Sequence, residues 1–179
     1  MQKRACLISL IIFLLHLNPL ISDAFGRPVY LFEGDRLDVP DDWEYHRGNP
    51  IPPDQPGMLF SAASRDGCGI RMDSAGLSQK AKDFITGVEQ FDDYITQLFA
   101  RSGVKIIKSS RSEQSEIAGF RALEKSYEFE QNGSVHKAKI LQFNSEHHLY
   151  NAGIVVLSDS NYDECVAQGK KILNSFKSK

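Results

Sequence analysis

The chain has 179 residues, 41% of them hydrophobic and 25% charged, and a formal net charge of −2. This length accommodates one domain and is short for two. No stretch is strongly basic, which argues against a nucleic-acid partner because binding phosphates requires a concentrated positive surface.

The first 24 residues have the three parts of a secretory signal peptide. A basic pair at 3–4 precedes an apolar run at 5–15, and Ser22 and Ala24 are the small residues that favour cleavage after Ala24. Removal of this segment leaves one domain at 25–179 with no second run long enough to cross a membrane. An uncleaved anchor is the alternative, but a run of about 11 residues is short for a span, which needs about 20.

The first elements of the remaining chain are predicted strands. Alternating apolar residues between 29 and 39 suit one strand or two short ones, and Trp43 follows a turn. Residues 44–57 are predicted to form an irregular loop, because four prolines lie in it: Pro50, Pro52, Pro53 and Pro56. The next strand pair is predicted at 58–63 and 68–72.

Trp43 and the four prolines form a candidate partner surface. Prolines at this density favour the extended polyproline II form that docking segments use. The alternative interpretation is a stiff, solvated crossover between two strands.

A helix is predicted from Phe84 to about Gly103, because its apolar residues recur at spacings of three and four. A strand is predicted to begin at Val104. Asn132-Gly133 then predicts a tight hairpin between strands at 119–131 and 134–143. A two-residue loop places Gln131 opposite Ser134. That register pairs Glu128 with Lys137 on one face, and Tyr127 with Ala138 and Phe129 with His136 on the other.

The last two elements are predicted to pack against each other. Residues 147–157 are apolar on both faces, which is typical of an interior strand that is covered on both sides. A final helix is expected to begin at a cap formed by Asp159 or Ser160. Gly169 on its apolar side indicates close packing of this helix on the sheet.

Two cysteines, Cys68 and Cys165, remain after cleavage. Export to an oxidising compartment favours a disulfide between them. The alternatives are two separate buried thiols, or a reactive thiol at Cys68, which glycines flank on both sides.

The histidines are the main candidates for a catalytic or metal-binding site. His147 and His148 are adjacent on a predicted strand, so they point to opposite faces and do not readily share a metal. His136 together with one of them would still lack identified third and fourth ligands. The sequence contains no G-x-S-x-G, H-E-x-x-H, C-x-x-C or phosphate-binding glycine loop. We therefore predict no catalytic residues, no metal and no cofactor.

The order of several short motifs resembles the PsbP-like and DcrB-like domains over about residues 30–177. These motifs are a strand ending Pro-Asp-Asp-Trp at 40–43, a helix with Phe91, Tyr94 and Leu98, a glycine-led strand at 117–122, and a closing Ile-Leu-Asn-Ser-Phe-Lys at 172–177. The resemblance implies an α+β sandwich, in which an antiparallel sheet of about six to seven strands is flanked by helices. It also implies binding and accessory roles without a shared catalytic motif.

Together these features predict an exported, non-enzymatic accessory or binding protein, periplasmic or secreted, whose partner is another envelope protein. One alternative is a small secreted hydrolase or metal-dependent enzyme that uses His136, His147 or His148. Another alternative is an inhibitor or immunity-type protein.

Overall fold

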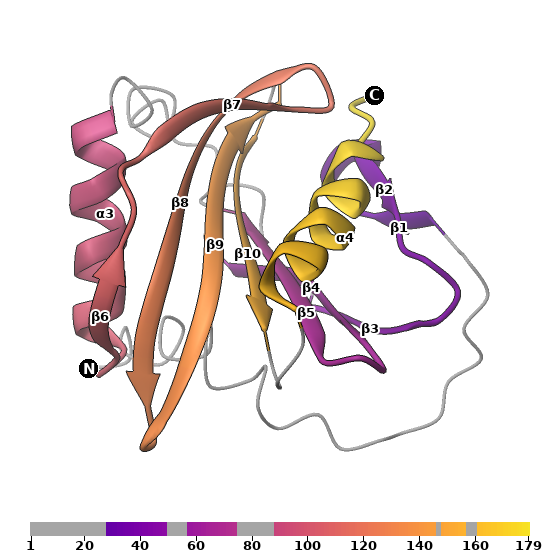
Figure 1. Cartoon of the computed structure of the whole chain (residues 1–179). Helices are drawn as coiled ribbons and strands as arrows, with labels where there is room; N and C mark the ends of the chain where they lie inside the picture. The colour runs from indigo at the N-terminus through magenta and orange to yellow at the C-terminus, as the bar shows by residue number, and fades with distance from the viewer. Residues whose placement is uncertain (1–27, 50–56, 75–87, 146–147, 157–160) are drawn as a thin grey trace.

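The computed structural model describes residues 28–49, 57–74, 88–145, 148–156 and 161–179 (Figure 1). These residues form an α+β fold, in which a large antiparallel sheet carries one helix on each face. The predicted signal peptide, the four prolines, His147 and the predicted caps Asp159 and Ser160 lie outside the described residues.

A small separate sheet contains the first two strands. β1 (Pro28–Tyr30) pairs with β2 (Arg36–Asp38), and a single 3-10 turn, η2 (Phe32–Gly34), connects them. Val29 lies opposite Leu37, and both side chains are buried. The sequence left open one strand or two short ones between 29 and 39, and the structure has two.

Within the described residues, the large sheet has eight antiparallel strands. Their order across the sheet is β3 (Trp43–Arg47), β4 (Gly57–Ser64), β5 (Cys68–Ser74), β10 (Leu149–Val156), β9 (Ser134–Asn144), β8 (Phe120–Gln131) and β6 (Lys105–Ser109), with β7 (Glu113–Ile117) also on β8. β6 and β7 lie end to end along β8, because they pair with different halves of that strand. The expected α+β sandwich with an antiparallel sheet is therefore confirmed.

The β8–β9 hairpin has the predicted register. Gln131 faces Ser134, and the three further pairs predicted from the two-residue loop are all present: Glu128 with Lys137, Tyr127 with Ala138, and Phe129 with His136. Asn132 and Gly133 both have positive φ, as a tight hairpin turn requires.

β3 differs from the sequence prediction. Residues 43–47, most of which were assigned to the irregular loop, pair with β4. Trp43 is only 3% exposed and packs in the core on the same side as the second helix. The prediction that Trp43 belongs to a partner surface is therefore wrong, because its indole is buried.

The two helices cover opposite faces of the sheet (Figure 1). α3 (Val88–Arg101) packs on β6, β8 and β9 through Phe91, Ile95 and Phe99. α4 (Tyr162–Asn174) packs on β5 and β10 through Cys165, Ile172 and Leu173. The cap of α4 is Asn161, whose side chain accepts a hydrogen bond from the Asp163 amide at 3.0 Å.

β10 is buried along its whole length, which confirms the interior strand predicted there. Ile154 faces α4, and Val155 faces α3. Gly169 lies directly over this strand: a Cβ atom added to it would lie 2.7 Å from Ile154 Cδ1. The close approach of helix and sheet that Gly169 predicted is present.

Candidate functional site

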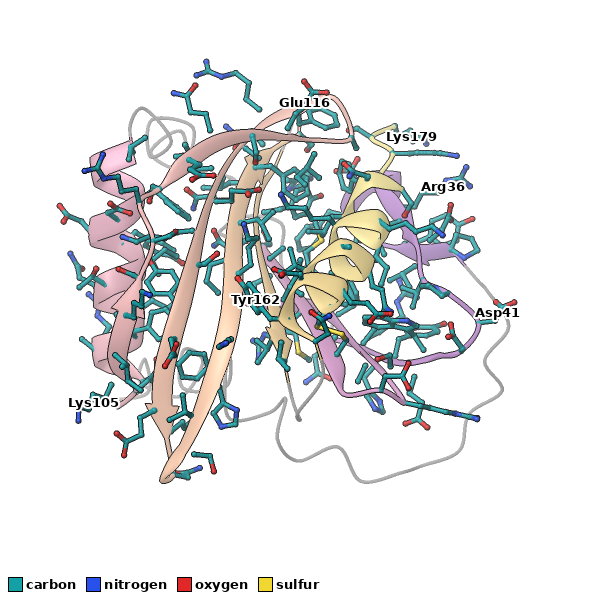
Figure 2. All side chains as sticks on the ribbon, in the orientation of Figure 1. Arg36, Asp41, Lys105, Glu116, Tyr162 and Lys179 are labelled. Atoms are coloured by element: carbon teal, nitrogen blue, oxygen red, sulfur yellow. A yellow bond between two sulfur atoms is a disulfide. The ribbon has the colours of Figure 1, made fainter. Side chains whose placement is uncertain are left out.

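A pocket of about 650 Å³ lies where β7 turns into β8, beside the first described turn of α3. This volume is in the range of small-ligand sites. Its lining residues are Val88, Gln114, Ser115, Glu116, Gly119, Phe120, Arg121, Ala122, Leu123 and Asn144. Figure 2 places Glu116 at this end of the molecule and Lys105 at the opposite end of the same sheet edge.

The pocket combines an apolar floor with polar walls. Leu123 is buried and lies opposite Gln114 in the ladder, whereas Glu116 lies opposite Arg121 with both side chains exposed. Asn144 of β9 also belongs to the lining. A few placed polar groups over an apolar floor are typical of a binding site.

The turn at the pocket is held in an unusual backbone conformation. Ala118 has φ of 52° and Gly119 has φ of 87°. Positive φ is uncommon for a residue with a side chain and is maintained only where the surroundings impose it. Here the Ala118 amide donates to Asn174 Oδ1 of α4 at 2.9 Å. The pocket therefore has a fixed rim attached to the second helix.

A polar cluster lies on the α3 face of the sheet. Arg71 is 3% exposed, and its Nε donates to both carboxylate oxygens of Asp73, at 2.9 and 3.2 Å. Burial raises the pKa of Asp73 above its ordinary value, although the charge and the hydrogen bonds of Arg71 act in the opposite direction. Burial, with the charge of Asp73 as a second cause, raises the pKa of Tyr94.

A chain of amide hydrogen bonds connects the sheet to α3. Gln142 Nε2 donates to Asn151 Oδ1 at 2.7 Å, and Asn151 Nδ2 donates to the Tyr94 hydroxyl at 3.3 Å. Lys125 forms a second connection, since its Nζ lies 2.9 Å from Asp92 of α3. These groups hold the helix in place on the sheet.

Glu124 has the equivalent role on the other face. Its Oε1 accepts hydrogen bonds from Lys139 of β9 and Lys170 of α4, each at 2.9 Å. Burial by itself would raise the pKa of Glu124, but the bonds from these two lysines outweigh it and hold the pKa below 4.5. The carboxylate is therefore charged at neutral pH and joins α4 to two strands.

Asp35 collects bonds from distant parts of the chain. It is 2% exposed and accepts hydrogen bonds from Tyr150 Oη at 2.6 Å and from the Ser178 hydroxyl at 2.9 Å. The Ser145 hydroxyl also donates to Asp35, at 3.3 Å, and the imidazole of His148 stacks on Phe32. Asp35 therefore bonds directly to Ser145, whereas in a catalytic triad a histidine lies between the acid and the nucleophile.

The candidate histidines lie far apart. His136 packs against Phe129 near the start of β9, and His148 lies beyond the end of the same strand. About ten residues of extended chain at about 3.4 Å each separate them. In the described ranges, no group of three or more histidine, cysteine, aspartate or glutamate side chains is arranged to hold a metal.

The two cysteines are joined. A disulfide connects Cys68 of β5 to Cys165 of α4, with Cα atoms 5.4 Å apart and 97 residues of separation along the chain. It lies in the core between sheet and helix, since both residues are at most 3% exposed. Among the described helices, neither is long and apolar enough to cross a membrane.

The pocket was not predicted from the sequence, because β7 forms one of its walls and was not predicted as a strand. The segment Glu-Gln-Ser-Glu-Ile at 113–117 is too polar to be identified as a strand by its apolar residues. A usable signal was Ala118-Gly119, a small residue followed by glycine between two segments that could pair as a hairpin. The four prolines of the predicted partner surface lie outside the described residues.

Comparison with known proteins identifies similar structures and no related sequence. No protein-family model and no curated protein matches the chain. The solution structure of a cyanobacterial PsbP, CyanoP from Synechocystis sp. PCC 6803, aligns with a TM-score of 0.61 and 10% identity, over 91% of this chain and 99% of that one. A crystal structure from Bacteroides thetaiotaomicron VPI-5482 aligns with a TM-score of 0.53 and 9% identity, over 81% of this chain and 45% of that one. At these identities the likeness concerns the fold.

Proposed function

We propose that this chain, which has a PsbP-like fold, is an exported accessory protein of the cell envelope that acts by binding another protein. The observation that carries the proposal is the pocket between β7 and β8. It presents exposed polar side chains on two paired strands, so a partner would meet groups whose positions the sheet has already fixed. Binding to such a surface costs little conformational entropy.

The buried charged groups support a binding role over catalysis. Asp73 is paired with Arg71, and Glu124 is paired with two lysines. The first pair lies within β5, and the second joins β8 to β9 and α4, so in both cases the charges already have partners inside the fold. The accessible polar side chains of Gln114, Glu116 and Arg121 instead line the pocket.

Two features support export. The first 24 residues have the charge, apolar run and small residues of a signal peptide. The Cys68–Cys165 disulfide is the kind of bond that persists in an oxidising compartment such as the periplasm or the extracellular space.

The test is capture from the envelope of the producing cell. The full chain would be expressed with a C-terminal tag, fractionated, and its mature mass determined. We expect the mass of a chain that begins at Phe25 and recovery of a partner protein from the envelope fraction.

Variants of the pocket residues test whether capture of the partner depends on the pocket. The double change Gln114→Ala and Arg121→Ala should reduce recovery of the partner, and Arg111→Ala is the control, because Arg111 is an exposed arginine outside the pocket. Retention of the unprocessed chain in the cytoplasm, or equal recovery by both variants, would contradict the proposal.

A further inference from the structure

β6 and β7 form one edge of the sheet, and only the β6 half of this edge is protected against pairing with a strand of another chain. β6 carries Lys105 and Lys108, and a register shift between Ile106 and Lys108 interrupts its ladder. Lysines and bulges are the devices that keep an edge strand from pairing with another chain. β6 therefore discourages addition of a strand.

β7 lacks the lysines and the bulge of β6. Its five residues pair with β8 without a register shift, and it contains neither lysine nor proline. Within the described ranges, β8 is the only strand that pairs with β7, so its outer edge faces no other strand. Glu113, Gln114 and Glu116 are exposed on it.

The pocket lies at this unprotected half. Gln114, Ser115 and Glu116 of β7 line it, so the backbone edge and the pocket belong to the same segment. Proteins that bind peptides by strand addition combine these two elements: main-chain bonds provide affinity, and adjacent pockets select side chains.

The charges indicate what would bind. Glu113 and Glu116 are the only ionisable residues of β7, and Glu116 lies opposite Arg121 of β8, which offsets part of its charge. Glu113 also lies opposite Glu124, whose charge Lys139 and Lys170 already engage. An incoming strand with basic side chains would meet a complementary edge, and an acidic one would be repelled.

We propose that β7 is a docking edge for an extended, basic segment of a partner protein, which adds as a further strand and inserts a side chain into the β7–β8 pocket. The inference rests on the proposed binding function and specifies its site and the chemistry of the partner.

The test uses the oxidised mature chain and a capped hexapeptide of alternating valine and lysine, with binding followed by backbone amide shifts. We expect saturable shifts in 113–121. The same peptide with glutamate in place of lysine should bind about tenfold more weakly or not at all. A peptide methylated on its central backbone nitrogens should also lose binding, because strand addition needs those donors.

Protein variants complete the test. Glu113→Lys with Glu116→Lys transfers the protection of β6 to β7 and should weaken binding about tenfold. The control is Glu44→Lys, a single substitution of the same kind on β3 at the other edge of the sheet. Equal binding of the methylated peptide, equal binding of the acidic peptide, or no binding of the basic peptide would overturn the inference. A dimer of the chain that the β7 variant dissociates would overturn it too, since a second copy would then occupy the edge.

These outcomes separate the two proposals. If the β7 lysine variant still captures the envelope partner at the wild-type level, the docking edge is wrong and the binding function stands. If the wild-type chain captures no partner, the proposed function itself fails.

Discussion

Replacement of Glu124 by glutamine tests how the second helix is held. The change removes one negative charge and retains the shape of the side chain. Lys139 and Lys170 would then face a neutral amide, whose oxygen can still accept hydrogen bonds but balances the charge of neither lysine. We expect α4 to remain in place and the folded state to be destabilised.

The magnitude follows from burial. Removal of one partner from a fully buried ion pair costs about 3–5 kcal/mol. The Lys139 and Lys170 side chains are 16% and 32% exposed, so water compensates part of this loss. We therefore expect a loss of about 2 kcal/mol at pH 7, which corresponds to a decrease of roughly 6 °C in Tm for a domain of this size.

The pH dependence has a definite sign. The folded-state pKa of Glu124 lies below 4.5, so the stabilisation from its carboxylate is fully present above that pH and is lost as pH falls through the folded pKa. The difference in stability between wild type and Glu124→Gln should be constant from pH 7 to about pH 5 and shrink below pH 4.5.

Urea unfolding followed by tryptophan fluorescence measures this, since Trp43 is the single tryptophan and is buried. The control is Glu128→Gln on the same strand, where we expect a change below about 0.5 kcal/mol because its cross-strand partner Lys137 is exposed. An unchanged midpoint for Glu124→Gln, or a loss that is independent of pH, would refute the reasoning.

Three further predictions concern the packing of α4 and the C-terminal segment. Gly169→Val should lower the free energy of unfolding by about 2 kcal/mol, because its side chain would collide with Ile154; an unchanged urea midpoint would contradict this. The untreated mature chain should show no free thiol in a thiol titration, and replacement of Cys68 and Cys165 by alanine should cost about 4 kcal/mol, as expected for the release of a long loop. Asp35→Asn should accelerate hydrogen exchange at the amides of Arg36 and Lys177, each of which donates to the carbonyl oxygen of the other residue. Asp41→Asn in the exposed turn should leave exchange at these amides unchanged.

The sequence predicted correctly those elements whose form depends on residues that are neighbours in the chain. Asn132-Gly133 fixed a two-residue turn, and the pairing of β8 with β9 followed residue by residue. The continuous apolar run of β10 correctly indicated cover on both faces, since each face carries a helix.

Elements that depend on distant partners were not predictable in this way. β3 forms because residues 43–47 pair with β4 across the proline-rich segment, and the same packing buries Trp43. β7 forms because β8 is long enough to pair with two strands in succession. Its polar residues carry no signal of this pairing.

The buried charges were also invisible to a single sequence. Arg71 and Asp73 occupy alternate positions on β5, which by themselves suggest a solvated face. They are buried in the folded protein, so an ion pair occurs where a sequence pattern predicts exposed polar side chains.

The most direct test of a binding role at the β7 edge is photo-crosslinking in the producing cell. A photoreactive amino acid would replace Gln114 in the β7–β8 pocket or, as the control, Glu44 at the opposite edge of the sheet. We predict that the processed chain forms one discrete adduct with a second protein from position 114 and none from position 44. Adducts of equal yield from both positions, or no adduct from position 114, would contradict the account.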